Sequence, residues 1–330
     1  MDNHYDRYLS YKTQIEDKLF TFIDKKSPEG LYDPMKYVLS GGGKRIRPMM
    51  VILSCEAFGG KMENALDAAV AIEILHNFTL VHDDIMDNAD TRRGEETVHK
   101  KWDISTAILA GDGLLGLSYR SLLKTKSPRI ADIAKVFTEG MIDVCEGQSY
   151  DKEFELRNDV SIDEYIMMIG MKTSRLLETC AVIGAHIAEA SPEQADAMKN
   201  YAENLGLAFQ LQDDLLDITA DEKEFGKKIG GDVREGKKTY LLLKALDLVE
   251  KESEHHLLNK IILPGRKDPI TDDEINHVKN IYKDLGIIDD TRKLVESYTQ
   301  KADSYLGVVK NENNRQALKW FSGMLLDRSS

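Results

Sequence analysis

Proline placement is the sequence feature that most limits how this chain can fold. The chain of 330 residues holds only seven prolines, and none falls within 49–127, 129–191 or 193–263. Proline in a helix interior costs about 3 kcal/mol, so long stretches without it favour long helices. We therefore expect every proline to stand at a helix start or in a connection: Pro28, Pro34, Pro48, Pro128, Pro192, Pro264 and Pro269.

Apolar residues recur at helical spacing inside these stretches. Steps of three or four residues, with a single step of seven, link three sets: Ala65, Ala68, Ala69, Ile72 and Leu75; Leu205, Ala208, Leu211, Leu215 and Ile218; Ile166, Ile169, Leu176, Leu177 and Cys180. This is the period of a helix and not the alternation of a strand. The chain is therefore predicted to be all-α, with roughly ten to thirteen helices. Its length allows two average domains or one large helical domain. The stretch 262–272 is expected to connect to a polar helical tail at about 270–330.

Charge and cysteine content argue against several classes of protein. Lys and Arg number 44 against 57 Asp and Glu, a net charge of −13, which disfavours a broad basic face for nucleic acid. The first residues lack the apolar core of a signal peptide, and no run of about 18 apolar residues could span a membrane. Cys55, Cys145 and Cys180 are far apart, which predicts buried thiols in a reducing compartment and hence a cytoplasmic protein.

Two aspartate clusters share one spacing. They are Asp83, Asp84 and Asp87, and Asp213, Asp214 and Asp217. In each, the first and last aspartate are four positions apart, so both carboxylates share one helix face. Like charges so placed destabilise a helix, and more so on an apolar face, unless a cation neutralises them. Oxygen ligands suit Mg²⁺, which keeps waters and prefers substrate phosphates. A solvated acidic face is the alternative for one cluster, whereas two favour a function.

Basic residues accompany both clusters, as an anionic substrate would require. Two basic segments flank the first cluster: Gly41-Gly42-Gly43-Lys44-Arg45-Ile46-Arg47-Pro48 and Arg92-Arg93-Gly94. Lys172 and Thr173 stand in a long apolar segment, where a lysine is costly unless it is paired or reaches water. Glycine-lysine steps at 226–232 and 236–239 resemble phosphate-binding loops. His76 lies seven residues before the first cluster, on the same helix face. Each feature alone could be an ordinary turn or helix cap.

Together these motifs resemble those of the trans-isoprenyl diphosphate synthases, the polyprenyl synthetase family. The resemblance spans about residues 40–240 and rests on segments in the family's order: GGGKRIRP, LHNFTLVHDDIMDNADTRRG, GD at 111–112, EGQSYD, MKTSRLL, FQLQDDLLDI, GKKIGGD and GKKT. Glu96 stands where the family usually has proline, a departure that leaves the expected ligands intact. The resemblance implies a single polyprenyl synthetase domain over residues 1–330. Its expected fold is an isoprenoid-synthase-type bundle of helices around a central cavity, usually as a homodimer.

The resemblance also implies roles for individual residues. Three Mg²⁺ ions per active site, replaceable by Mn²⁺, would be held by Asp83, Asp87, Asp213 and, through water, Asp217, with support from Asp84. The allylic diphosphate would contact Arg92, Lys172, Lys227 and Lys237, with Gln210 beside it. The diphosphate of isopentenyl diphosphate would contact Lys44, Arg47, His76 and Arg93. Thr173 would lie near the reacting carbons.

The implied reaction agrees with the chemistry of these residues. Isopentenyl diphosphate condenses head to tail (1′-4) with an allylic diphosphate, which is dimethylallyl, geranyl or farnesyl diphosphate. Metal and lysine neutralise the leaving diphosphate as the allylic C–O bond ionises, and the alkene attacks the cation. The departed diphosphate is the expected base for the final proton. A dry, apolar cavity keeps water away from the cation.

Three other functions stay open as alternatives. A class I terpene cyclase would usually carry a second metal motif of the Asn/Ser/Glu type. A phosphohydrolase with a His82-Asp83 dyad would need both side chains on one metal, although neighbouring helix residues diverge by about 100°. A non-catalytic subunit of a heteromeric synthase would show degenerate aspartates, whereas both clusters are intact here.

Product length is expected to depend on two residues before the first cluster. In the family, the residue five before the first aspartate often limits product length, and here it is Phe78, followed by Thr79. One aromatic residue and one threonine most resemble the geranylgeranyl diphosphate (C20) synthases, with farnesyl diphosphate (C15) as the alternative. On an ideal helix Phe78 lies about 140° from Asp83, so an ordinary core role is also open.

Overall fold

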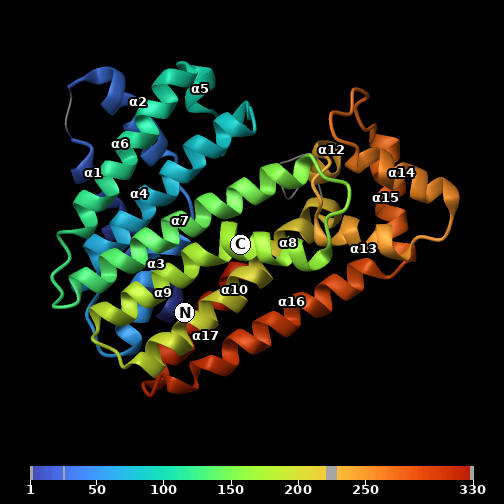
Figure 1. Ribbon diagram of the computed structural model, residues 1–330. Helices are drawn as coiled ribbons and strands as arrows, with labels where there is room; N and C mark the ends of the chain where they lie inside the picture. The colour runs from blue at the N-terminus through green and yellow to red at the C-terminus, as the bar shows by residue number, and fades with distance from the viewer. Residues whose placement is uncertain (1–2, 25–26, 221–228, 328–330) are drawn as a thin grey trace. The chain divides into compact units, whose positions relative to one another are not determined.

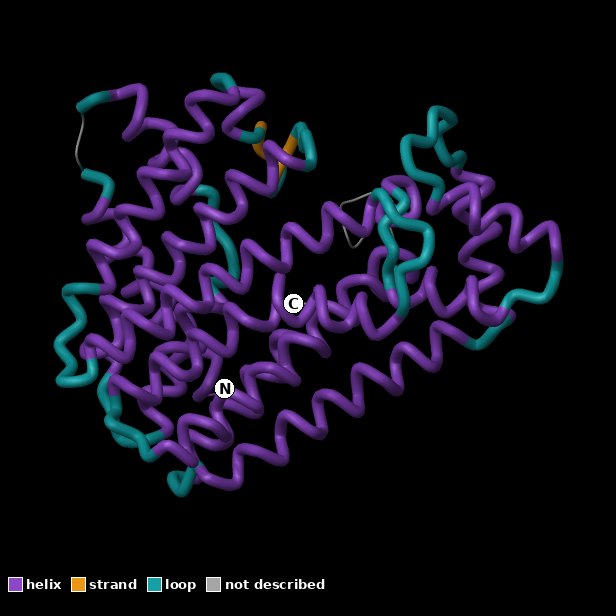
Figure 2. The backbone as a smooth tube through the Cα atoms, viewed as in Figure 1, coloured by secondary structure: helices purple, strands orange, loops and turns teal. Residues whose placement is uncertain are grey.

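Helices form nearly all of the described structure. The computed structural model describes residues 3–24, 27–220 and 229–327, and Figure 2 shows helices joined by short loops. Within these residues the only strands are β1 (Thr91–Arg92) and β2 (Glu95–Glu96), which form one antiparallel pair. The prediction of an all-α chain is confirmed.

The chain divides into two compact units, each made of segments distant in the sequence. Unit 1 comprises Met1–Glu139, Thr179–Met198 and Val308–Leu318, and unit 2 comprises Gly140–Glu178, Lys199–Gly307 and Lys319–Ser330. Every boundary falls inside a helix. Elements shared by both units are α7 (Ile130–Glu155), α9 (Arg175–Ile187), α10 (Pro192–Thr219), the 3-10 turn η2 (Tyr305–Val308) and α17 (Glu312–Leu326). The single domain over 1–330 stays a prediction.

Unit 1 is built around one long apolar helix. In this unit α4 (Met62–Met86) packs against α3 (Ile46–Ala57) and α6 (Ile104–Leu122), as Figure 1 shows. The predicted apolar set on α4, from Ala65 to Leu75, is entirely buried. Its spacing therefore marks residues of α4 that pack into the core. The other helices wholly within this unit are α1 (Asn3–Phe22), α2 (Glu29–Ser40) and α5 (Val98–Lys101).

Unit 2 holds two buried apolar clusters. The first gathers residues of α10, α13 (Tyr240–Leu248), α14 (Glu252–Ile262) and α15 (Asp272–Asp284). The second joins α8 (Ile162–Ile169) to α10 and α16 (Ile287–Ser304). A short helix, α12 (Gly231–Glu235), follows α10. The connection predicted at 262–272 lies between α14 and α15, and the tail beyond it is helical as expected.

Pro34 and Cys145 are not where the sequence predicted them. Pro34 lies inside α2 and is buried; it stands near the start of a short helix, where it removes a single main-chain hydrogen bond. Cys55 and Cys180 are buried as predicted, but Cys145 is exposed. It occupies the outward face of α7, next to the buried Val144, because successive helix residues point in different directions.

A π-helical turn, η1 (Gly170–Ser174), joins α8 to α9 in one continuous helix. With this helix counted once, the described residues form fifteen α-helices, slightly more than the predicted ten to thirteen. The short helices α5 and α12, of four and five residues, account for the difference. A π turn inserts an extra residue into a helix and is frequent at functional sites. This one carries Lys172 and Thr173, two of the residues that the sequence singled out.

Two glycines allow neighbouring helices to approach this turn closely. A Cβ added at Gly147 on α7 would lie 2.4 Å from the backbone nitrogen of Lys172. A Cβ added at Gly206 on α10 would lie 2.3 Å from the hydroxyl oxygen of Ser174. Real Cβ atoms do not approach other atoms this closely, so the turn is held between two positions where only glycine fits.

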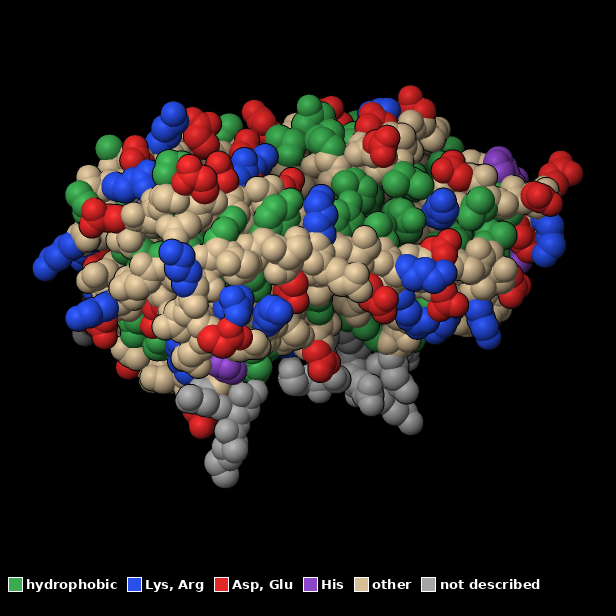
Figure 3. Space-filling view, turned by 90° about the horizontal axis from the view of Figure 1, so that it is seen from below, with side chains coloured by type: hydrophobic (Ala, Val, Ile, Leu, Met, Phe, Trp, Pro, Cys, Tyr) green, Lys and Arg blue, Asp and Glu red, His purple; other side chains and the backbone are tan. Residues whose placement is uncertain are grey.

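The surface is mixed in charge. On the face seen in Figure 3, acidic and basic side chains are interspersed, with apolar side chains between them. Among the described residues, none of the helices combines the length and the apolar character needed to cross a membrane.

We predict that Gly147→Ala lowers the stability of the fold, because the new methyl group meets the backbone of the π turn and one of the two helices must shift. Overpacking of this kind costs about 1–3 kcal/mol, which should appear as a lower midpoint of thermal unfolding. Gly116→Ala is the matched control, since Gly116 lies within α6 and its added Cβ has no neighbour within 4 Å. An unchanged midpoint for Gly147→Ala would contradict the close packing of the turn.

Candidate active site

The first aspartate cluster lies at the C-terminal end of α4. Asp83 and Asp84 belong to its last turn, and Asp87 is the C-cap residue, whose N–H donates to the Asp83 carbonyl at 2.8 Å. The C-terminal end of a helix carries partial negative charge, so carboxylates there are unfavourable without a cation nearby. The structure thus confirms the shared helix and adds a second reason to expect a bound cation.

Asp84 is the buried member of this cluster, with 4% of its surface exposed. Its Oδ1 accepts a hydrogen bond from the Arg92 Nε at 2.7 Å. Burial raises the pKa of Asp84, and the charge of Arg92 opposes that rise. The pair supports an ionised Asp84 and orients the Arg92 guanidinium beside the cluster.

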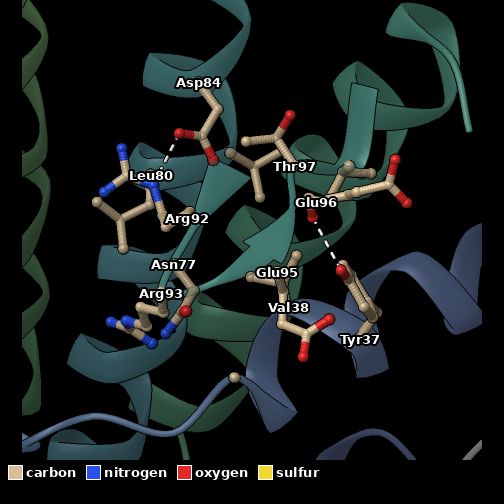
Figure 4. A pocket seen from close by; sticks show the side chains of 13 residues that line it. Tyr37, Val38, Asn77, Leu80, Asp84, Arg92, Arg93, Glu95, Glu96 and Thr97 are labelled. Atoms are coloured by element: carbon tan, nitrogen blue, oxygen red, sulfur yellow. Dashed lines mark hydrogen bonds and ion pairs between the residues drawn. The ribbon is translucent and has the colours of Figure 1, made fainter. Parts of the chain in front are cut away.

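A small β-hairpin places the two arginines. Arg93 and Gly94, with φ of 54° and 82°, connect β1 to β2; two such residues in the left-handed region make the tight turn that suits a hairpin. The hairpin and α4 line a pocket of about 480 Å³, shown in Figure 4, where Arg92 points to Asp84. No hairpin was predicted here, because the turn lacks the usual Asn-Gly or Asp-Gly.

A group of arginines surrounds His76 in unit 1. The Arg47 Nη1 lies 3.1 Å from the His76 Nε2, and the Arg93 Nη1 donates to the Gly42 carbonyl at 2.5 Å. Burial lowers the pKa of His76 well below its usual value, and the nearby charges of Arg47 and Arg93 lower it further. His76 is therefore neutral and accepts a hydrogen bond from Arg47. The buried Arg47 Nε has no hydrogen-bond partner among the described residues, which suits an anionic ligand.

Two residues of the GGGKRIRP segment have other surroundings. Arg45 is buried, with its Nη1 2.6 Å from the Glu73 Oε1 and its Nε 3.1 Å from the Glu16 Oε1, so it anchors the segment to the core. Lys44 is exposed, and its carbonyl accepts from the Tyr8 hydroxyl at 2.8 Å. Of the two, only Lys44 was predicted to bind substrate, and its side chain lies at the surface.

The two residues predicted to limit product length, Phe78 and Thr79, lie on α4, the helix that carries the first aspartate cluster. Phe78 is buried, and its ring centroid is 4.8 Å from that of His82 in an edge-on arrangement. The Thr79 hydroxyl donates to the His76 carbonyl at 2.8 Å. His82 in turn packs where a Cβ at Gly111 would collide with it, 2.2 Å away. These contacts engage His82 in packing, which does not favour a metal-binding dyad with Asp83.

The second aspartate cluster lies at the C-terminal end of α10, in unit 2. Beside it is a pocket of about 580 Å³, which we call the lysine–aspartate pocket. Its lining combines carboxylates, lysines and apolar side chains of α8: Asp151, Tyr165, Met168, Ile169, Lys172, Thr173, Gln210, Asp213, Asp214, Asp232, Lys237, Lys238 and Thr239. The pocket brings together five residues that the sequence predicted: Lys172, Thr173, Gln210, Asp213 and Lys237.

A chain of hydrogen bonds crosses this pocket. The Thr173 hydroxyl donates to the Gln210 Oε1 at 3.0 Å, and the Gln210 Nε2 donates to the Asp214 Oδ1 at 2.9 Å. The Tyr165 hydroxyl donates to the other carboxylate oxygen of Asp214. Burial raises the pKa of Asp214, and the neighbouring charge of Asp232 raises it further. The chain fixes Thr173 and Gln210 in one orientation toward the pocket.

Two of the pocket's lysines are paired with carboxylates. The Lys172 Nζ lies 2.5 Å from Asp151, and the Lys237 Nζ lies 2.8 Å from Glu235 and 3.5 Å from Asp232. Burial alone would lower the pKa of Lys237, but the carboxylates of Asp232 and Glu235 raise it above its usual value. Both ammonium groups are therefore held in place by carboxylates of the protein.

Asp217 contacts the backbone of α12. Its carboxylate oxygens accept hydrogen bonds from the N–H groups of Gly231 and Asp232, each at 3.1 Å, and its carbonyl accepts from Gly230 at 2.8 Å. Asp217 thus caps the start of α12 and fixes Asp232 beside the pocket. Burial raises the pKa of Asp232 to about 7; the Lys237 charge opposes that rise, and the Asp217 and Asp213 carboxylates add to it.

This concentration of carboxylates suits a hard divalent cation. In the described part of the chain, no three Asp, Glu, His or Cys side chains are gathered closely enough to hold a metal by themselves. Carboxylate oxygens are ligands of hard divalent cations, which can take water and substrate phosphate as their remaining ligands. The mutual repulsion at Asp213 and Asp232 is the strain that a cation there would relieve.

Several pocket residues were not predicted from the sequence. Asp151 belongs to the EGQSYD segment and Asp232 to GKKIGGD, so their positions in those motifs were the available signal. Lys238 belongs to the GKKT segment, so its motif was likewise the available signal. Tyr165 had no such signal, since its neighbours in the pocket come from other helices. The predicted Lys227 lies outside the described residues.

Comparison with known proteins agrees with these motifs. The polyprenyl synthetase family model matches residues 28–285. A geranylgeranyl diphosphate synthase of Sulfolobus acidocaldarius is 38% identical, covering 99% of this chain and 98% of its own. A geranylfarnesyl diphosphate synthase of Natronomonas pharaonis is 35% identical over 92% of each chain. The crystal structure of geranylgeranyl pyrophosphate synthetase from Pyrococcus horikoshii is similar in fold, with a TM-score of 0.92, 34% identity and 99% coverage of both chains. With most of its length matched and its motifs in order, this chain belongs to the polyprenyl synthetase family.

Proposed function

We propose that this chain is a prenyltransferase that condenses isopentenyl diphosphate with an allylic diphosphate to make an all-trans prenyl diphosphate. The observation that carries the proposal is the lysine–aspartate pocket, where the π turn places Lys172 and Thr173 beside Asp213. Lysines for a leaving diphosphate, carboxylates for its metal and a hydroxyl for the reacting carbons meet in one cavity. That combination suits ionisation of an allylic C–O bond.

The lysine–aspartate pocket is the proposed site of ionisation. Lys172 and Lys237 bind the leaving diphosphate as charge develops on it, and their carboxylate partners hold them in position beforehand. Gln210 orients Thr173 through their hydrogen bond. Mg²⁺ bound through Asp213, with Asp217 positioning the neighbouring turn, would supply further positive charge to the departing group.

The arginine group around His76 is the proposed site for isopentenyl diphosphate. Arg47 and Arg93 provide guanidinium donors suited to a diphosphate, and Lys44 adds a charge from the exposed loop. Neutral His76 accepts from Arg47 and directs its other nitrogens to the ligand. In the second step the alkene of this substrate attacks the allylic cation, and the departed diphosphate removes the proton.

The first cluster is proposed to act on the allylic diphosphate as well. Asp83 and Asp87 would bind Mg²⁺, with three ions per active site and Mn²⁺ as a substitute, while Asp84 and Arg92 support them.

A cytoplasmic location and a homodimer are further proposals. The three free thiols support a reducing compartment, and the usual assembly of the family supports the dimer. Sedimentation of the purified chain would give the number of copies in the assembly.

Geranylgeranyl diphosphate is the proposed main product. Phe78 followed by Thr79 is the pattern that favours C20, and the Sulfolobus acidocaldarius relative carries that product in its name. The Natronomonas pharaonis relative is named for a C25 product, so a longer product is one outcome to be measured. Farnesyl diphosphate is the shorter alternative.

One incubation separates this function from its alternatives. The purified chain would be supplied with Mg²⁺, labelled isopentenyl diphosphate and each allylic primer in turn, and the extracted products would be sized. Chain elongation supports the proposal. Cyclised hydrocarbon would indicate a terpene cyclase, free phosphate a phosphohydrolase, and no product a non-catalytic subunit.

We predict that Asp83→Asn and Asp213→Asn each lower turnover about 10³-fold, because each removes a metal-binding charge worth several kcal/mol in the transition state. Neither should lower the midpoint of thermal unfolding, since each removes one charge from a group of neighbouring carboxylates. Asp284→Asn is the matched control, an exposed aspartate at the end of α15. Near-normal turnover at saturating Mg²⁺ in either variant would overturn the metal assignment.

We predict that Phe78→Ala lengthens the main product by at least one five-carbon unit, because loss of the buried ring opens space along α4. The measurement is chromatography of the dephosphorylated products. Phe58→Ala, a partly buried phenylalanine packed against the small Ala185 cluster, controls for general loosening. An unchanged product distribution would place the limit on chain length elsewhere.

A further inference from the structure

Lys238 is the third lysine of the lysine–aspartate pocket, and the reaction proposed for this site gives it no role. It lines the pocket beside Lys237 and Thr239, yet it was not among the residues predicted from the sequence. Only 8% of its surface is exposed. A lysine this deeply buried is rare unless its charge is paired.

The other two pocket lysines are paired, and Lys238 has no such partner among the described residues. Lys172 contacts Asp151 at 2.5 Å, and Lys237 contacts Glu235 at 2.8 Å. Within the described part of the chain, Lys238 makes no ion pair within 4.0 Å and no side-chain hydrogen bond. Glu155 is the carboxylate that most affects it electrostatically, but Glu155 is itself paired with Lys152 at 2.8 Å.

Burial of most of the Lys238 side chain is costly, because the charged form loses part of its hydration without compensation from the protein. In keeping with this, burial lowers the pKa of Lys238. Its ammonium nitrogen is not among the fully buried atoms, so it remains open to a ligand in the pocket. Such a cost can be offset by a bound anion. It can also be avoided if the ammonium reaches water while its methylene stem covers apolar surface. The two explanations differ when an anion occupies the pocket. In the first the ammonium contacts the anion, and in the second it stays in water.

We propose that the Lys238 ammonium binds the diphosphate of the allylic substrate, and the inorganic diphosphate left after its ionisation. This inference rests on the proposed function and adds a residue to it. Lys172 and Lys237 bring their own carboxylates into the pocket, so each adds little net positive charge there. Lys238 is the described pocket lysine whose charge no described carboxylate offsets by direct contact, and a diphosphate is the anion that the pocket's function supplies.

The position of Lys238 in the chain suits this role. It stands between Lys237, which is held by Asp232 and Glu235, and Thr239, whose hydroxyl caps the start of α13 by accepting from the Leu242 N–H. Both neighbours are therefore fixed, so little entropy is lost when the ammonium meets a ligand. A hydrogen bond to a charged group of this kind corresponds to about a tenfold change in affinity.

The test is binding of inorganic diphosphate, in the presence of Mg²⁺, to the full chain by titration calorimetry. Lys238→Met keeps the apolar stem and removes the charge, and Lys238→Arg keeps a charge. Lys244→Met is the matched control, a partly buried lysine on α13 that does not line the pocket.

We expect Lys238→Met to weaken diphosphate binding about tenfold and to raise the KM for the allylic substrate, while the KM for isopentenyl diphosphate is unchanged. The diphosphate affinity of Lys238→Arg should stay within about threefold of that of the natural chain. The affinity of Lys244→Met should equal that of the natural chain. Because Lys238→Met removes a buried charge, its midpoint of thermal unfolding should not fall. This combination of preserved stability and weaker binding is not expected of a purely structural lysine.

Suppose that the natural chain binds diphosphate and elongates substrate. Unchanged diphosphate affinity in Lys238→Met would then overturn the inference about Lys238, while the proposed function would stand. No diphosphate binding by the natural chain with Mg²⁺ would overturn the proposed function as well. If Lys238→Met does not fold, Lys238→Gln gives the same comparison, and equal affinities for the Gln and Arg variants would overturn the inference.

Discussion

The rest of the structure depends on one electrostatic constraint. Aspartate carboxylates lie near the C-terminal ends of two helices, where the helix dipole is negative. Near their C-terminal ends α4 and α10 each carry aspartates of one spacing, and a negative charge in the last turn of a helix costs about 0.3–1 kcal/mol. A fold that only needed stability would place lysine or arginine there. Here the positive charges come from neighbouring segments instead. Arg92 of the hairpin pairs with Asp84, and Lys237 pairs with Asp232 beside the second cluster. Each cluster suits the cations and the anionic substrate proposed for it.

The two clusters use their middle aspartates in the same way. Asp84 and Asp214 are both buried, with 4% and 6% of their surfaces exposed, and both accept hydrogen bonds from side chains of the protein. Asp217 is bound to the backbone of α12. These three carboxylates therefore hold neighbouring groups in place, and the motif combines ligands with the supports that position them. A substitution at a supporting position would disturb the site through the residues it orients.

The sequence predicted elements and motifs better than it predicted contacts. Helix spacing and proline gaps identified the all-α fold, because both reflect local backbone and burial constraints that a single segment reveals. Lys172 and Asp213 were recognised from motifs, and the structure places both in one pocket. Tyr165 was missed because its importance comes from contacts between helices that are distant in sequence. Lys238 was missed as an individual residue, although its segment, GKKT, was recognised. The predictions for Pro34 and Cys145 were wrong because packing decides both, and no local pattern records it.

The neutral state of His76 suits the anion binding proposed for this group of arginines, which needs no broad basic surface. Arginine charges approach His76 from two segments, the start of α3 and the hairpin after α4. A protonated imidazole would add a like charge and repel them, whereas the neutral ring accepts from Arg47 at 3.1 Å and fixes its direction. The positive charge is thus concentrated on planar guanidinium groups, which match a diphosphate in shape, while the net charge of the chain remains −13. Local orientation, more than total charge, determines which anion such a site can select.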